Sequence, residues 1–330
     1  MSDPILITGA AGFIGFHTAQ KLLAQNEVVI GVDNLNDYYD IQLKKDRLAQ
    51  LASASNFTFC RLDISDRDAM QRLWDEKGPF KRVVHLAAQA GVRYSLENPY
   101  AYISSNVMGH LVVLEMCRHT EDFEHLVYAS SSSVYGKNEK LPYAVEDRVD
   151  DPISLYAATK KSDELISHSY SHLYGIPQTG LRFFTVYGPW GRPDMAYFIF
   201  TKAISEGKAL PVFNNGQMKR DFTYIDDIID GILLTLKTPP PKDGHSAPYR
   251  VLNLGNHKSE NLMDFIHEIE TALNKKAEIA FKPMQPGDVL ETFADIEETT
   301  VLTGYMPKTT IRDGIPLFVE WYRGYYHQDA

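Results

Sequence analysis

The stretch ILITGAAGFIG, residues 5–15, joins a short apolar run to a glycine-rich turn, and a helix-like segment, residues 17–25, follows it. Its glycine spacing is G-x-x-G-x-x-G rather than G-x-G-x-x-G. Glycines so placed keep a strand-to-helix turn tight and let its backbone approach a pyrophosphate at the helix N-terminus. We therefore predict a dinucleotide-binding turn. Its predicted cofactor contacts are Gly9, Gly12, Phe13, Ile14 and Gly15.

Short apolar runs recur along the chain and alternate with helix-like stretches. The runs occupy residues 27–32, 57–62, 82–88, 126–130, 178–184 and 250–254, and helical patterns cover 101–119, 155–173, 225–236, 259–274 and 311–326. This alternation is typical of an α/β protein with a doubly wound parallel sheet, the Rossmann arrangement. We expect a Rossmann domain from residues 1–184 and about 222–254, and a smaller mixed α/β C-terminal domain from about 185–221 and 255–330.

The bulk properties exclude several classes of protein. The 330 residues carry a formal charge of −10, which argues against general binding of nucleic acid or anionic membranes. Cys60 and Cys117 have no metal-ligand spacing, so we expect no metal and a reducing compartment. With no signal-peptide pattern and no apolar run of about 18 residues, a cytoplasmic protein without a membrane span is expected.

Acidic residues follow the second and third apolar runs. Asp33, beside Asn34, stands where a carboxylate accepts hydrogen bonds from the adenosine ribose and repels a 2′-phosphate. No arginine occurs between Asp33 and Tyr39, so NAD is favoured over NADP. Asp63, next to Ile64, either lies near the adenine or, like Ser65 and Asp66, caps the helix that follows.

The fourth run ends in small residues at the sheet edge where a cofactor would lie. Ala87 and Ala88 leave room for a flat ring, although close packing explains them equally well. The predicted cofactor contacts of this segment are Leu86, Ala87, Ala88 and Gln89.

Catalytic residues are predicted after the fifth run and on the helix that follows it. The run delivers four serines, residues 130–133, to the carboxyl edge of the sheet, where open α/β sheets bind ligands. Tyr156 and Lys160 are four residues apart and share a helix face, so the ammonium favours the phenolate that could act as a base. Ser131, Tyr156 and Lys160 together predict proton transfer at a substrate hydroxyl, with hydride passing to a nicotinamide. The choice among the four serines stays open.

Taken in chain order, these elements resemble the extended short-chain dehydrogenase/reductase family. The matching features are Gly9-x-x-Gly12-x-x-Gly15, Asp33, Asp63, the Ser131 region and Tyr156-x-x-x-Lys160. The resemblance implies a tightly held NAD and a C-terminal domain that binds a nucleotide sugar.

Within that family the chain is similar to nucleotide-sugar 4-epimerases, most of all those that act on UDP-glucuronate. The segments that carry this similarity are residues 85–95, 182–195 and 220–227. The family pattern places Arg220 and Asp288 at the UDP moiety and Asn106 and Phe213 along its approach. Arg93, in the first of the similar segments, is also expected to bind the substrate. We further expect Ser132, Ser133, Thr185 and Arg192 to hold the sugar carboxylate, although Ser132 and Thr185 are also ordinary packing residues.

Two other kinds of function stay open at this point. The first is another reaction of the same family, UDP-glucose/galactose epimerisation or decarboxylation of UDP-glucuronate. The second is an NAD-sensing protein without catalysis, which the retained Tyr156 and Lys160 disfavour. The resemblance also implies a homodimer in which helices 101–119 and 155–173 pair as a four-helix bundle.

Overall fold

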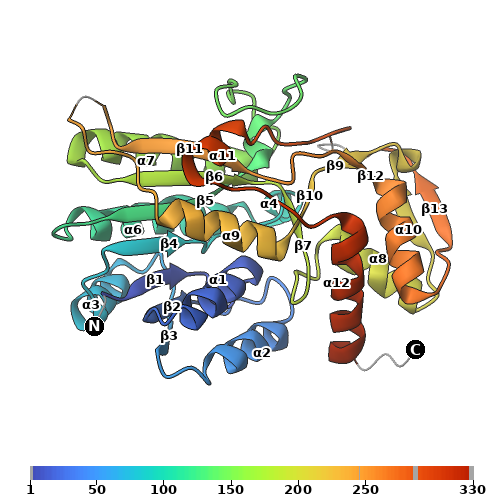
Figure 1. Ribbon diagram of the computed structural model, residues 1–330, viewed down its shortest axis with the longest axis horizontal. Helices are drawn as coiled ribbons and strands as arrows, with labels where there is room; N and C mark the ends of the chain where they lie inside the picture. The colour runs from blue at the N-terminus through green and yellow to red at the C-terminus, as the bar shows by residue number, and fades with distance from the viewer. Residues whose placement is uncertain (1–2, 245, 285–288, 327–330) are drawn as a thin grey trace.

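The computed structural model describes residues 3–244, 246–284 and 289–326. Its centre is a seven-stranded sheet with the order β11-β6-β5-β4-β1-β2-β3 (Figure 1), and every neighbouring pair in it is parallel. The strands are β1 Ile5–Thr8, β2 Val29–Asp33, β3 Phe57–Arg61, β4 Arg82–His85, β5 His125–Ser131, β6 Gln178–Phe183 and β11 Tyr249–Leu254. This confirms the predicted doubly wound Rossmann sheet.

Helices cover both faces of the sheet because alternate strand residues point to opposite sides. Ile5 and Ile7 pack in one apolar cluster with Phe16 of a helix, whereas Leu6 packs in another cluster with Leu73 and Val113. The first face carries α1 Phe13–Ala24, α2 Ile41–Leu51 and α9 Ile225–Leu236. The second carries α3 Arg67–Lys77, α6 Gly109–Arg118 and α7 Leu155–Tyr174. The patterns read from the sequence did not mark α2 and α3.

The predicted helix 101–119 is built from three pieces. A short α5, Pro99–Tyr102, leads into a π-helical segment η1, Ile103–Met108, and then into α6. π-Helical turns are rare and concentrate at functional sites, where they place a particular side chain. Here the segment carries Asn106, whose side chain points into the protein interior.

Apart from α11 Glu297–Thr303, which packs on β11 and α9, the remaining helices and strand pairs lie to one side of the large sheet (Figure 1). The paired strands are β7 Thr185–Tyr187 with β10 Phe222–Tyr224, β8 Leu210–Phe213 with β13 Ile279–Lys282, and β9 Lys219–Arg220 with β12 Glu260–Asn261. The helices on this side are α8 Ala196–Ser205, α10 Leu262–Leu273 and α12 Ile311–Tyr326. Strand β11 is the edge strand of the large sheet, and helix α9 packs on α1 and β5. The domain boundaries themselves stay a prediction.

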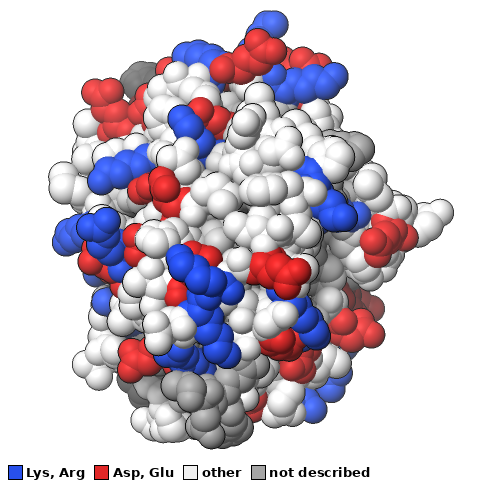
Figure 2. All heavy atoms as spheres, turned by 90° about the vertical axis from the view of Figure 1, so that its right-hand side faces the viewer, with Lys and Arg blue, Asp and Glu red and all other residues white. Residues whose placement is uncertain are grey.

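On the face that carries α8, α10 and α12, lysines and arginines lie interspersed with aspartates and glutamates (Figure 2). Several of these charges form pairs, such as Lys276 with Glu270 at 2.8 Å and Arg312 with Glu268 at 3.7 Å. Opposite charges mixed in this way create no large patch of one sign. Within the described ranges, none of the helices combines the length and the apolar content that crossing a membrane requires.

Candidate active site

The glycine-rich turn is closed by contacts that leave no space for side chains. Gly9 has a φ of +74°, and a Cβ on it would lie 2.8 Å from the backbone nitrogen of Ala87. A Cβ on Gly15 would lie 2.0 Å from the carbonyl oxygen of Gly9, so the first turn of α1 packs directly on the loop. Gly12 precedes α1 and has no side chain to cap it, which leaves the N–H groups of the first helical turn for another acceptor. We call this turn, residues 9–15, the glycine cradle, and its N–H groups at the start of α1 suit the pyrophosphate of a dinucleotide.

Asp33 links this cradle to the loop after β2. Its carboxylate accepts hydrogen bonds from the backbone N–H of Ala11 at 3.2 Å and of Leu35 at 2.8 Å. These bonds fix the carboxylate at the carboxyl end of β2, where an adenosine ribose lies in Rossmann folds. Asn34 turns toward the next strand and donates to Asp63 at 2.8 Å.

Asp63 lies in a polar turn and is separate from the cap of the following helix. Burial opposes ionisation of its carboxyl group, but hydrogen bonds from Ser65 and Asn34 outweigh that effect and hold the pKa of Asp63 below its ordinary value. The N-cap of α3 is Asp66, which accepts from the backbone of Ala69 at 3.0 Å. Ile64 points into the core and packs on Gly109 of α6. An adenine contact at Asp63 stays a prediction.

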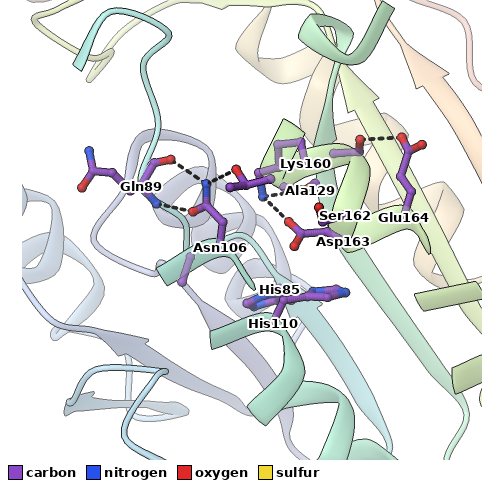
Figure 3. Close-up of polar contacts among 12 residues, drawn as sticks. His85, Gln89, Asn106, His110, Ala129, Lys160, Ser162, Asp163 and Glu164 are labelled. Carbon is purple, nitrogen blue, oxygen red and sulfur yellow. Dashed lines mark hydrogen bonds and ion pairs between the residues drawn. The ribbon is translucent and has the colours of Figure 1, made fainter. Parts of the chain in front are cut away.

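Thr8 and Asn106 fix the segment after β4, residues 86–89, by hydrogen bonds to its backbone. Ala87 donates its backbone N–H to the Thr8 hydroxyl at 3.1 Å. Asn106 accepts from the backbone N–H of Gln89 at 2.8 Å and donates to its carbonyl at 3.1 Å (Figure 3). The same Asn106 amide reaches Thr159 of α7 at 3.0 Å, and the side chain is 1% exposed. Asn106 therefore joins the cofactor edge to the helix that carries Tyr156, rather than presenting its own amide to a nucleotide.

The serines at the end of β5 have different surroundings. Ser130 is buried and donates to Glu164 at 2.7 Å, which in turn pairs with Arg182. Ser131 accepts a hydrogen bond from the backbone N–H of Ser133 at 3.2 Å and so caps the short helix η2, Ser132–Tyr135. That bond leaves the Ser131 hydroxyl hydrogen available to a ligand. Ser132 and Ser133 are half-buried at the same edge.

Tyr156 is the second residue of α7, and Ser154 caps this helix by accepting from Ala157 at 3.1 Å. The positive end of a helix dipole favours negative charge at this position. Lys160 lies one turn further along and is 3% exposed. Its ammonium donates to the carbonyl of Ala129 at 2.9 Å and to Asp163 at 3.1 Å, which leaves its third N–H for Tyr156 or a cofactor ribose (Figure 3). The Ala129 bond places the lysine beside the strand that ends in the serines.

Three buried ionisable residues near Lys160 were not predicted from the sequence: Asp163, His85 and His110. Burial raises the pKa of Asp163 to about 7, although Lys160 opposes the shift. The rings of His85 and His110 stack with centroids 5.3 Å apart (Figure 3). Burial is the main cause that lowers the pKa of His85 to about 3 and that of His110 well below its ordinary value, so both imidazoles are neutral. His85, His110 and Asp163 lie far apart in the sequence, on β4, α6 and α7, so no local pattern predicts that they are buried together.

Of the residues predicted to hold the nucleotide sugar, Arg93 and Phe213 come together from distant parts of the chain. The Arg93 guanidinium lies 5.6 Å from the centre of the Phe213 ring. Arg220 donates to the carbonyls of Lys219 at 2.8 Å and Leu290 at 3.2 Å. Asp288 lies outside the described residues.

Arg192 lies on residues 188–192, which we call the strap. Its guanidinium forms two hydrogen bonds with Asp194, at 2.6 and 3.0 Å, and lies 6.0 Å from the centre of the Tyr38 ring. Tyr38 also donates to Asp194 at 2.9 Å. Burial lowers the pKa of Arg192, but the Asp194 carboxylate more than offsets this, and the net shift is upward. Thr185 begins β7 directly after β6, beside the end of β5 that carries Ser131. From there the chain continues into the strap, whose Arg192 reaches Tyr38 in the loop after β2.

A parallel sheet with a glycine cradle, an acidic residue after β2 and a Tyr–Lys pair beside a serine defines a dinucleotide-dependent enzyme of the hydride-transfer type. A profile of the NAD dependent epimerase/dehydratase family matches residues 5–255. The chain belongs to this family.

Three relatives illustrate the similarity. The chain is 45% identical over 335 residues to a probable UDP-glucuronate 4-epimerase of Rhizobium meliloti, covering 98% of both chains. It is 48% identical to UDP-glucuronate 4-epimerase 2 of Arabidopsis thaliana, covering 98% of this chain and 76% of that one. The UDP-glucuronic acid 4-epimerase of Bacillus cereus, solved with UDP-glucuronic acid and NAD, is 36% identical with a TM-score of 0.88 over 98% of this chain and 100% of that one.

Proposed function

We propose that the protein catalyses the NAD-dependent 4-epimerisation of UDP-glucuronate to UDP-galacturonate through a 4-keto intermediate. The observation that supports the proposal is that the carboxyl edge of the sheet carries a serine and a buried lysine at the end of β5. Lys160 bonds to Ala129 near the end of β5, and we assign proton transfer to Lys160 together with Ser131 of that strand and Tyr156 of the same helix. An arginine, Arg192, lies on the strap that leads away from the same edge, and its planar fork is the side chain best suited to a carboxylate. The UDP-glucuronate 4-epimerases among the relatives support this substrate.

The residues divide the proton chemistry between them. Tyr156 takes the proton of the sugar 4-hydroxyl and returns it at the end, and Ser131 donates to the same oxygen. Lys160, held by Ala129 and Asp163, would direct its ammonium group toward the Tyr156 oxygen and the cofactor ribose. When bound, NAD supplies the hydride acceptor and then the hydride donor. The glycine cradle, Asp33 and the segment 86–89 would hold it, with Asp63 and Ile64 beside the adenine.

A second requirement comes from the intermediate. A 4-keto glucuronate is a β-keto acid, which loses carbon dioxide when its carboxylate bond aligns with the carbonyl π system. In our proposal Ser132, Ser133, Thr185 and Arg192 turn the carboxylate out of that alignment. Hydrogen bonds to a charged group contribute about 1.5–3 kcal/mol each, which suffices to fix an orientation. The Thr185→Val and Arg192→His variants should release more UDP-pentose per turnover than the parent enzyme, and equal amounts would contradict this role.

The proposal includes a UDP-binding surface and a homodimer. Arg220 and Asp288 are proposed to contact the UDP moiety and Phe213 to line its approach. Arg93, beside Phe213, is proposed as a further substrate-binding residue, and Asn106 fixes Gln89 near it. For the dimer, α5, η1 and α7 pack side by side and carry exposed apolar side chains, including Tyr100 at 85%, Leu165 at 58% and Leu173 at 66% exposure. A second copy would cover them. Sedimentation should give twice the mass of the chain, and Leu165→Lys should shift it toward the monomer.

The direct test is to incubate the purified protein with UDP-glucuronate, without added NAD, and to separate the products by chromatography. UDP-galacturonate from the wild type, and none from Tyr156→Phe, supports the proposal. Conversion of UDP-glucose instead, or of UDP-glucuronate to a UDP-pentose, assigns one of the related reactions. No turnover of these sugars, with NAD bound, would favour an NAD-binding protein without catalysis.

A further inference from the structure

Arg47 of α2 is a buried arginine whose hydrogen bonds all go to neutral acceptors. It is 0% exposed. Its Nη1 donates to the carbonyl of Ala11 at 2.9 Å and to the Tyr39 hydroxyl at 2.7 Å. Its Nε and Nη2 donate to the carbonyl of Trp190 at 3.1 and 2.5 Å, and Nη2 also donates to Gly191 at 3.1 Å. These bonds match the five N–H donors of a guanidinium.

No carboxylate among the described residues lies within ion-pair distance of Arg47. Burying a charge is costly, so a buried arginine is retained where its fork holds several groups in one arrangement. The groups held here come from three separate segments. Ala11 belongs to the glycine cradle, Tyr39 to the loop after β2, and Trp190 with Gly191 to the strap.

The strap depends on this support because its backbone is strained. Trp190 has a φ of +60°, a conformation that costs a bulky residue free energy and persists only when its surroundings enforce it. The Arg47 bonds to Trp190 and Gly191 hold the two peptides directly before Arg192. A further bond, from His17 of α1 to the carbonyl of Pro189 at 3.0 Å, fixes the other end of the turn.

We propose that Arg47 is a positioning residue: by tying the strap to the cofactor cradle, it places the Arg192 guanidinium for the sugar carboxylate. This inference rests on the proposed function, in which Arg192 binds that carboxylate. Four of the five bonds of Arg47 go to backbone carbonyls and the fifth to the Tyr39 hydroxyl, so all of its donors are occupied within the protein and it acts through Arg192 rather than on the ligand. The same bonds make the carboxylate site depend on the geometry of the NAD loop.

The test compares ligands with and without the carboxylate. In a Tyr156→Phe background with saturating NAD, the Kd values of UDP-glucuronate and of UDP are measured by calorimetry. Lysine offers three donors in place of five and no planar fork. Arg47→Lys should therefore raise the Kd of UDP-glucuronate about tenfold while changing that of UDP less than about threefold. Tyr39→Phe removes one acceptor of Arg47 and should raise the Kd of UDP-glucuronate, but not that of UDP, by a smaller factor. If Arg47→Lys does not fold, this variant tests the inference instead.

Two further variants separate positioning from general damage. Arg82 also forms two side-chain bonds, to Glu27 at 3.1 and 3.2 Å, but at the opposite edge of the sheet, so Arg82→Lys should leave both Kd values within about twofold. In an Arg192→Met background, Arg47→Lys should lose its selectivity.

An equal rise for both ligands, no rise for either, or a selective rise that survives Arg192→Met would each overturn the inference. The wild-type turnover assay is independent of these outcomes. If the wild type epimerises UDP-glucuronate and the Kd values do not separate, only the role of Arg47 fails.

Discussion

Replacing Asn106 with alanine should destabilise the protein by several kcal/mol, because three buried hydrogen bonds disappear together. The backbone N–H and carbonyl of Gln89 both lose their partner, and Gln89 is itself buried. An unsatisfied buried group costs about 1–3 kcal/mol, so these two contribute about 2–6 kcal/mol. Thr159 loses less, since its hydroxyl keeps a bond to the Tyr156 carbonyl at 2.9 Å.

The free energy of unfolding is measured by urea titration, and bound NAD is quantified in the purified protein. Asn253→Ala serves as the matched control, since Asn253 is also fully buried and forms three bonds, to Tyr135, Tyr143 and Asp295. It should cost a similar free energy and leave NAD content unchanged, whereas Asn106→Ala should lower NAD content because Gln89 moves at the cofactor edge. A loss below about 1 kcal/mol for Asn106→Ala would refute the reasoning.

Three other substitutions test the cradle and the buried ionisable groups. Gly15→Ala places a Cβ 2.0 Å from the Gly9 carbonyl oxygen and should lower bound NAD at least about tenfold, whereas Gly324→Ala in α12 meets nothing within 4 Å and should leave it unchanged. Burial lowers the pKa of His85 in the folded wild type to about 3, so between pH 6.5 and 3 the unfolded chain binds one more proton than the folded chain. The free energy of unfolding therefore decreases as the pH is lowered through this range. In His85→Gln this decrease should be smaller by about 1.4 kcal/mol per pH unit, measured by urea titration between pH 6 and 4. Asp163 acts with the opposite sign: its pKa is raised from 3.8 to about 7, so the folded state binds the extra proton and stability is lost as the pH rises through that window. Asp163→Asn should remove this loss, and an unchanged slope in either variant would contradict the assigned burial.

The sequence predicted those parts of the fold that depend on local pattern. Apolar runs gave the sheet, and the amphipathic spacing gave α9 and α12 within their observed bounds. The glycine turn was recognisable because its chemistry is contained in residues 9–15. Helix α2 was missed because two of its inward positions are Lys44 and Arg47, whose charges disguise its buried face.

The sequence predicted those candidate site residues whose roles follow from spacing to residues nearby in the chain. Tyr156, Lys160 and the serines follow from spacing and strand order. Arg47 acts on residues more than 140 positions away, and no local pattern records such a contact. Asn106 was placed along the nucleotide approach by family resemblance, whereas the π-helical turn directs its amide to Gln89 and Thr159.

The packing of α12 on the strap has a consequence for the order in which a nascent chain completes its active site. Trp190 contacts Trp321 and Tyr325 with ring centroids 5.3 and 5.1 Å apart, and Tyr325 bonds to Asp46 of α2. During synthesis domains generally fold as units, with N-terminal parts of the chain first. The large sheet, whose last strand ends at Leu254, can therefore form while Trp190 has Phe16 of α1 beside it, with ring centroids 5.8 Å apart, but not yet Trp321 and Tyr325. The packing of the strap is thus completed last, after residues 321–325 have emerged, although the strap itself is made much earlier.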